Sequence, residues 1–253
     1  MTKLQESLKK CKVEGNTVFL PPINVVLPNY NEVKTALIKA GAAYKKNAFV
    51  FPSEAKPFFD RLMGGEKVNI QKEFQYYEMP TSLVDRLIEF AQIESHDNIL
   101  EPSAGQGAIL EGIQRRFSGT GIDLTMDYCE LMENNRNILG KKIDCGGLRA
   151  LCVGIDFLKI SDTPKWNKII ANPPFTKNAD IDHIRKMYAV CKSGGRIVTI
   201  ASLHWQMTEN KKEIEFKKWL DKIGGRCASI IEAGAFKESG TNVATCIIVI
   251  NKK

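Results

Sequence analysis

The sequence predicts an α/β fold: a doubly wound, mostly parallel seven-stranded sheet preceded by a small α+β module. The first observation is a regular alternation. From Asn98 onward, short and nearly continuous apolar runs are separated by stretches with helical periodicity. Strands buried on both faces have this composition, and the helices between them provide the crossovers that parallel strands need. The second observation is that only a polar loop separates the last two apolar runs, which predicts an antiparallel pair at one edge of the sheet.

The first 75 residues differ in charge and pattern from the rest of the chain. They hold 12 Lys and Arg against 7 Asp and Glu, so they carry +5 of the formal net charge of +7. A basic excess of this kind favours a polyanionic partner. We therefore expect two domains, 1–75 and 76–253. The first is expected to contact nucleic acid, to cap the second, or to form a dimer contact.

Four elements are predicted within 1–75, and no internal repeat is apparent. The hairpin is expected to turn at Lys45–Asn47, and the last helix to begin at a capping serine and to stop at two glycines. The elements are a strand over 16–20, a helix over 31–42, a hairpin over 42–52 and a helix over 53–65.

Within 76–253 the strands are recognised by their apolar runs and the helices by their spacing and their glycine stops. The predicted strands are 98–102, 119–123, 148–156, 168–171, 195–202, 227–234 and 243–252. The predicted helices are one that follows Pro80, then 107–117, 126–139, 179–194 and 211–224.

Composition argues against several classes of protein. The seven cysteines are dispersed without a CxxC pair, and there are only three histidines, so we expect neither a metal site nor a disulfide framework. No apolar run approaches the roughly 20 residues of a membrane span, and the N-terminus lacks the apolar core of a signal peptide. We therefore expect a cytoplasmic protein with no membrane partner.

A glycine-containing loop follows the first predicted strand, in the segment "EPSAGQGAIL". Gly105 and Gly107 permit a tight turn and a close backbone approach to a ligand. A dinucleotide fingerprint would have a third glycine where Leu110 stands, and no Lys-Ser/Thr pair follows the loop as in a P-loop. The loop therefore favours a ligand that lacks a pyrophosphate.

Acids are expected at the ends of the next two strands, where ligands bind in such sheets. Asp123 is expected to end the second strand and to accept hydrogen bonds from ribose hydroxyls. Asp156 is expected to end the third strand and to accept from an exocyclic amine, with Phe157 beside it offering a ring face to a purine. Together with the glycine loop, these residues predict a pocket for a cofactor that carries a nucleoside.

Several motifs in this order resemble those of the class I S-adenosylmethionine-dependent amino-methyltransferases, and most closely the N6-adenine DNA methyltransferases, including small phage-encoded ones. The motifs are Glu101-Pro102-x-x-Gly105-x-Gly107, Asp123, Asp156-Phe157 and Asn172-Pro173-Pro174-Phe175. The resemblance covers about residues 74–253 and implies a Rossmann-like sheet. Upstream, "FQYYEMPTSLVDRLIEFA" resembles the segment that closes over the cofactor in that family, although Met79-Pro80-Thr81 departs from the more usual Thr-Pro-Pro.

The resemblance implies S-adenosyl-L-methionine as the cofactor and a specific set of residues around it. The implied cofactor-binding residues are Tyr77, Pro80, Thr81, Glu101, Pro102, Ser103, Ala104, Gly105, Gly107, Asp123, Leu124, Asp156, Phe157 and Asn172.

The catalytic residues we expect are Asn172, Pro173, Pro174 and Phe175. An adenine amino group is a poor nucleophile because its lone pair is delocalised into the ring. The Asn172 side-chain oxygen and the Pro173 carbonyl would accept its hydrogens and free the lone pair, the prolines would keep the turn rigid, and Phe175 would stack on the base. Since the sulfonium methyl is already activated, alignment and electrostatics suffice. The simpler interpretation is that Asn-Pro-Pro only forms a turn after a strand.

The expected partner is double-stranded DNA from which one adenine is flipped out, because a stacked base cannot reach such a pocket. The alternatives are a ribosomal RNA guanine-N2 methyltransferase, a protein glutamine methyltransferase, and a catalytically silent nucleic-acid-binding subunit of a methyltransferase pair. The sequence leaves the recognition sequence and the oligomeric state open.

Overall fold

The computed structural model describes residues 2–22, 25–51, 54–69, 79–207, 210–231 and 244–253. The chain divides into two compact units, Met1–Tyr76 and Tyr77–Lys253. We call them the N-terminal unit and the C-terminal unit, and each is described by itself.

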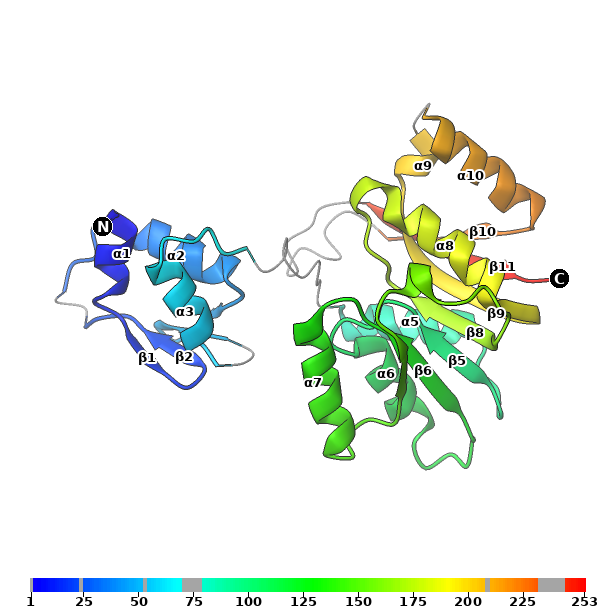
Figure 1. The fold of residues 1–253 in the computed structure, drawn as a ribbon, viewed down its shortest axis with the longest axis horizontal. Coiled ribbons are helices and arrows are strands. Elements are labelled where there is room, and N and C mark those ends of the chain that lie inside the picture. The colour runs from blue at the N-terminus through cyan, green and yellow to red at the C-terminus, as the bar shows by residue number, and fades with distance from the viewer. Residues whose placement is uncertain (1, 23–24, 52–53, 70–78, 208–209, 232–243) are drawn as a thin grey trace. The chain divides into compact units, whose positions relative to one another are not determined.

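The N-terminal unit is a four-stranded antiparallel sheet, in the order β1-β2-β4-β3, with its described helices against one face (Figure 1). The predicted hairpin is present, and Lys46 and Asn47 turn it with positive φ angles of 45° and 65°. The elements are α1 (Lys3–Leu8), β1 (Lys12–Glu14), β2 (Thr17–Phe19), α2 (Tyr30–Lys39), β3 (Ala43–Lys45), β4 (Ala48–Val50) and α3 (Lys56–Met63).

Two elements of this unit were not expected from the sequence, and one boundary differs. Helix α1 begins with a capping box in which the side chains of Thr2 and Gln5 reciprocally bind the backbone, and β1 pairs with β2. Helix α3 begins after Ala55, which makes no side-chain cap. The serine expected to cap it, Ser53, lies outside the described residues.

The N-terminal unit also contains an internal repeat, contrary to the expectation from sequence. Strands β3 and β4 begin 31 residues after β1 and β2, and the C-caps of α1 and α2, Lys9 and Ala40, have the same separation. The central strands pair symmetrically about Val18 opposite Phe49. A helix followed by a hairpin therefore occurs twice, and a local two-fold axis relates the two copies. The sequences of the two copies share little beyond an asparagine at the turn and an apolar strand, which is why the pattern was not apparent.

The C-terminal unit confirms the predicted doubly wound fold. Its seven strands have the order β10-β11-β9-β8-β5-β6-β7, and β5 to β9 run parallel while β11 is antiparallel to both of its neighbours. The strands are β5 (Asn98–Glu101), β6 (Thr125–Cys129), β7 (Leu151–Gly154), β8 (Trp166–Ala171), β9 (Cys191–Ser202), β10 (Arg226–Ile231) and β11 (Thr245–Asn251). The helices are α5 (Thr81–Ala91), α6 (Ala108–Phe117), α7 (Glu133–Asp144), η1 (Phe157–Lys159), η2 (Thr176–Asn178), α8 (Ala179–Val190), α9 (His204–Met207) and α10 (Lys211–Lys222).

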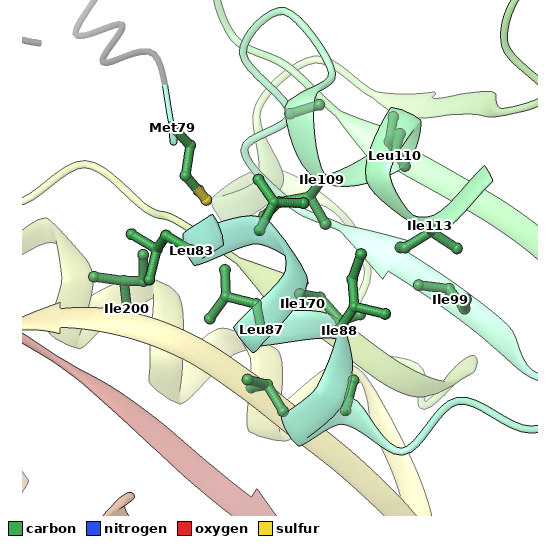
Figure 2. Packing of buried hydrophobic residues seen from close by; sticks show 14 of the residues in the cluster. Met79, Leu83, Leu87, Ile88, Ile99, Ile109, Leu110, Ile113, Ile170 and Ile200 are labelled. Atoms are coloured by element: carbon green, nitrogen blue, oxygen red, sulfur yellow. The ribbon is translucent and has the colours of Figure 1, made fainter. Parts of the chain in front are cut away.

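Helices cover both faces of this sheet. On one face, side chains of α5 and α6 interlock above the strands, as Figure 2 shows for Leu83, Leu87 and Ile109 against Ile170 and Ile200. On the other face, α8, α9 and α10 pack over a separate apolar cluster. None of the described helices is both long and apolar enough to cross a membrane.

The expected second strand, 119–123, is wrong, and the helix expected over 126–139 is right only for 133–139. Gly119 and Gly121 have φ angles of 74° and 75°, a turn conformation that a strand does not adopt. The strand is instead β6, which starts at Thr125, and helix α7 starts only at Glu133. This shift changes which acid lies at the end of the strand.

Candidate functional site

Four strands of the C-terminal unit end level with one another. In the parallel pairings, Leu100 lies opposite Ile169, Glu101 opposite Tyr128, and Cys129 opposite Gly154. The polar residues at or just beyond these ends therefore lie along one edge of the sheet, where open α/β sheets bind ligands. These residues are Glu101 at the end of β5, Glu130 after β6, Asp156 after β7 and Asn172 after β8.

The glycine loop lies between Glu101 and α6, and two of its glycines have positive φ angles. Gly105 and Gly107 have φ angles of 55° and 93°. A Cβ on Gly107 would lie 2.6 Å from Leu139 Cδ2 of α7, so Leu139 would have to move to admit a side chain, and the φ of Gly107 disfavours one as well. The loop is tied to the next strand because the Ala104 N–H donates to the Cys129 carbonyl at 3.0 Å. Pro102 and Ser103 form the first part of this turn.

Glu130 is a site residue that the sequence analysis missed. It is 6% exposed, and one of its oxygens accepts from the Gly105 N–H at 2.7 Å. The other accepts from the Met132 N–H at 2.8 Å and from Asn135 Nδ2 at 3.3 Å. A carboxylate has about four acceptor positions, so the three donors found among the described residues leave one for a ligand. The available signal was weak: an acid directly after Tyr128 and Cys129, with Asp127 interrupting the apolar pattern before them.

Asp123 and Leu124 do not lie at this edge, which corrects their assignment. Asp123 precedes β6, its carbonyl accepts from the His96 N–H that precedes β5, and its side chain is 79% exposed. Leu124 packs against the core beside it. Both residues therefore lie at the amino ends of the strands, on the edge opposite Glu130.

Glu101 carries a buried oxygen without a partner. The residue is 2% exposed, and its Oε2 accepts no hydrogen bond from any of the described residues. Burial raises the pKa of this carboxyl well above its ordinary value, and the charge of Glu130 raises it further, against a hydrogen bond from the Leu110 backbone. Such an acceptor suits a cationic ligand group, which would supply the missing donor and the compensating charge.

Asp156 lies where it was expected, but Phe157 does not offer its ring. The Asp156 side chain caps η1 by accepting from the Leu158 N–H at 3.1 Å, and Lys159 Nζ lies 3.3 Å from it. Phe157 is 2% exposed, and its ring centroid lies 5.7 Å from that of His183 on α8. In this conformation Phe157 belongs to the core, so the expected stacking on a purine does not follow from its position.

The segment after β8 contains a second buried acceptor without a partner. Asn172 follows the last residues of β8, which are fully buried. Its Oδ1 is buried as well, but it accepts no hydrogen bond from any described residue. Pro173 is buried, while Pro174 and Phe175 are half-buried, and Phe175 packs against the α5–α6 side of the core. The Asn172 amide oxygen is thus fixed at the edge of the sheet and available to a donor from a ligand.

The backbone just after this segment is strained and anchored. Lys177 and Asn178 both adopt left-handed conformations, with φ angles of 56° and 59°. Asn178 Nδ2 donates to Glu213 Oε1 at 2.7 Å, and Lys212 Nζ donates to the Asn178 carbonyl at 3.2 Å. Glu213 is only 2% exposed. Helix α10 therefore holds the turn that follows Phe175.

The segment before α5 is only partly described. Tyr77 lies outside the described residues. Pro80 is the N-cap of α5, Thr81 is its exposed first residue, and Met79 is 8% exposed and packs against the core (Figure 2). Among the described residues, no group of three or more His, Cys, Asp or Glu side chains is arranged to hold a metal ion.

No family model matches the chain, and no curated protein matches it. Solved structures do match it. A putative class I S-adenosylmethionine-dependent methyltransferase from Listeria monocytogenes superposes with a TM-score of 0.58 at 17% identity, over 78% of this chain and 67% of that one. A type I restriction-modification methyltransferase subunit from Streptococcus thermophilus gives 0.59 at 16% identity, over 70% of this chain and 45% of that one.

A third match has a different kind of substrate. Geranyl diphosphate C-methyltransferase from Streptomyces coelicolor, in complex with S-adenosyl-L-homocysteine, gives a TM-score of 0.51 at 13% identity, over 68% of this chain and 79% of that one. The chain therefore has the class I S-adenosylmethionine-dependent methyltransferase fold. Because this fold serves unlike substrates, the substrate must be argued from the site. The chain also spans less than half of the restriction-modification subunit.

Proposed function

We propose that the C-terminal unit transfers a methyl group from S-adenosyl-L-methionine to an exocyclic amino group of a nucleobase, and that this group is N6 of adenine in DNA. The observation that carries the proposal is the buried Oδ1 of Asn172, which has no partner among the described residues and is followed by Pro173-Pro174-Phe175 at the end of β8. An acceptor without a donor is costly in the interior, so its place at the ligand-binding edge is best explained by a donor on a ligand.

The hydrogen-bond acceptors at the neighbouring strand ends suit the cofactor. Glu101 has an unpartnered oxygen suited to the ammonium group, and Glu130 keeps one acceptor position suited to a ribose hydroxyl. The Gly105–Gly107 turn permits a close approach of the backbone. Bound S-adenosyl-L-methionine supplies a methyl group already activated on a sulfonium.

The residues of the chain would then act on the base. Asn172 Oδ1 and the Pro173 carbonyl would accept the two amino hydrogens, which draws the nitrogen toward a tetrahedral geometry and frees its lone pair. Phe175 would support the ring by stacking. The chain's work is orientation and electrostatics, and the amino proton leaves to solvent after transfer.

Two observations favour DNA as the substrate: the net charge of the chain and its likeness to a structural neighbour. The net charge of +7 favours a polyanion over a protein substrate. One structural neighbour is named a methyltransferase subunit of a restriction-modification system. The base would have to be flipped out of the duplex to reach the site.

The proposal is tested by incubating the purified chain with S-adenosyl-L-methionine that carries a tritiated methyl group. Duplex DNA, single-stranded DNA, ribosomal RNA and a protein extract serve as parallel substrates. We expect label in DNA, recovered as N6-methyl-2′-deoxyadenosine when the DNA is digested to nucleosides. Label confined to RNA or to protein would refute the DNA assignment, and label in none of them would favour a catalytically silent subunit.

A further inference from the structure

The N-terminal unit leaves one face of its sheet uncovered by its described helices. On the helix side, Val18 and Phe49 lie opposite one another at the centre of the sheet, and both are 0% exposed. Side chains alternate between the two faces along each strand. The neighbouring Phe19 therefore points to the other face, where it is 40% exposed.

Phe19 belongs to a row that crosses the whole sheet. Residues directly opposite one another share a face, and Lys12 lies opposite Phe19, Phe19 opposite Ala48, and Ala48 opposite Lys45. We call these four residues the Lys12–Lys45 row. Three strand spacings separate its two lysines, which is about 14 Å. Both lysines are exposed, whereas Ala48, between Phe19 and Lys45, is only 6% exposed.

The internal repeat shows that the two lysines belong to this row alone. With the repeat's offset of 31 residues, Lys12 corresponds to Ala43 and Lys45 to Glu14. Glu14 and Ala43 end the other row of the same face, which therefore has no lysine. Lys12 does pair with Glu14 at 2.5 Å, but both side chains are more than half exposed, and such pairs are weak.

An exposed aromatic ring between two lysines is the arrangement that binds unpaired nucleotides: a base stacks on the ring, and the ammonium groups meet the phosphates on either side. We propose that the Lys12–Lys45 row binds a stretch of unpaired nucleic acid, with Phe19 as the stacking platform. The excess charge of +5 within residues 1–75 complements this occupant. A duplex fits less well, because its bases are stacked on one another and present only their edges.

This inference rests on the proposed function for the kind of polymer that is bound, since that reaction needs a base outside the stack. Binding can nevertheless be measured without methyl transfer. The two proposals can therefore fail separately.

The test uses the full chain and a fluorescein-labelled 20-nucleotide single strand, with its duplex as comparison, followed by fluorescence anisotropy at several salt concentrations. We expect the single strand to bind more tightly than the duplex. Phe19→Leu keeps an apolar side chain but removes the stacking face, and should weaken single-strand binding about tenfold, whereas Phe19→Trp should preserve it.

Paired lysine variants provide the charge control. Lys12→Ala with Lys45→Ala should reduce the slope of log K against log salt by about 1.4, as expected for two phosphate contacts to a single strand. Lys3→Ala with Lys39→Ala removes the same charge from exposed positions on α1 and α2 and should leave that slope nearly unchanged. Equal effects of the two pairs, no effect of Phe19→Leu, or a preference for the duplex would overturn the inference. If the row variants bind normally while DNA is still methylated, only this inference fails.

Discussion

In the proposed mechanism, methyl transfer depends most on one side-chain atom, the amide oxygen of Asn172. Asn172→Ala should lower the rate of methyl transfer at least 100-fold, because the amino nitrogen loses an acceptor that pulls on its hydrogens. Binding of S-adenosyl-L-methionine should change little. Single-turnover transfer and isothermal titration calorimetry measure the two quantities, and turnover at the wild-type rate would remove Asn172 from the mechanism.

Two acids provide a matched comparison for the cofactor site. Glu130→Gln should weaken binding of S-adenosyl-L-methionine about tenfold or more, because hydrogen bonds to a charged acceptor are worth about 1.5–3 kcal/mol. Asp123→Asn makes the same chemical change at the opposite edge of the sheet, where the side chain is 79% exposed, and should leave affinity unchanged. Calorimetry showing the reverse pattern would restore Asp123 to the pocket.

The raised pKa of Glu101 leads to a dependence of stability on pH. The folded state holds the proton of Glu101 more tightly than the unfolded chain does. In the unfolded chain the pKa of this carboxyl is about 4.3, and in the folded protein it is raised. The contribution of Glu101 to stability is therefore lost as the pH rises from the first pKa through the second. Glu101→Gln should therefore raise the Tm of the ligand-free protein at pH 8 and leave it unchanged near pH 4. It should also weaken cofactor binding. A lower Tm at pH 8 would mean that the buried charge is already compensated.

The sequence correctly placed Asn172 and Glu101 at strand ends, but it put Asp123 at the end of the second strand, where Glu130 lies instead. Ile169-Ile170-Ala171 is an unambiguous buried run, so the residue after it could be located. Thr125–Cys129 includes Asp127 and continues into a stretch with helical spacing, so local pattern favoured a helix. Its pairing with β5 and β7 makes it a strand, and that pairing is not visible in local sequence.

Among the helices, α10 has a role beyond covering the sheet, because Glu213 anchors the strained turn after Phe175. Asn178→Gly keeps the left-handed backbone but loses the bond to Glu213, while Asn178→Ala loses both. We expect each to lower kcat several-fold through a less fixed Phe175. The alanine variant should in addition be less stable by about 1 kcal/mol, the cost of a left-handed conformation.

Thermal melts and steady-state kinetics check this expectation. Glu213→Gln retains an acceptor for Asn178 and should keep most of the activity that Glu213→Ala loses. Equal Tm values for the glycine and alanine variants at Asn178 would show that the left-handed turn carries no strain.

The long elements were predictable and the short ones were not. Runs such as 195–202 and 243–252 identify buried strands by composition alone, and the missing crossover between the last two strands predicted their antiparallel pairing. Strands of three residues, such as β1, are too short for any periodicity. Helix α1, with six residues, left only its Thr2–Gln5 capping signal.

The two units together suggest a division of labour: the C-terminal unit would do the chemistry, and the N-terminal unit would hold nucleic acid through the Lys12–Lys45 row. The sequence predicted the basic charge of the first unit but not its repeat. The two copies have few residues in common, so the symmetry is seen only in the strand pairing about Val18 and Phe49. On the face that the described helices leave uncovered, one row carries two lysines and the other none, and only the strand pairing shows this difference.

The most direct test of the account is long-read modification mapping of DNA from cells that express the wild-type chain, beside cells that express Asn172→Ala. We predict N6-methyladenine in a defined sequence context with the wild-type chain and its absence with the variant. Unmodified adenine in both samples, or the same modification in both, would contradict the claim that Asn172 directs a methyl group onto adenine in DNA.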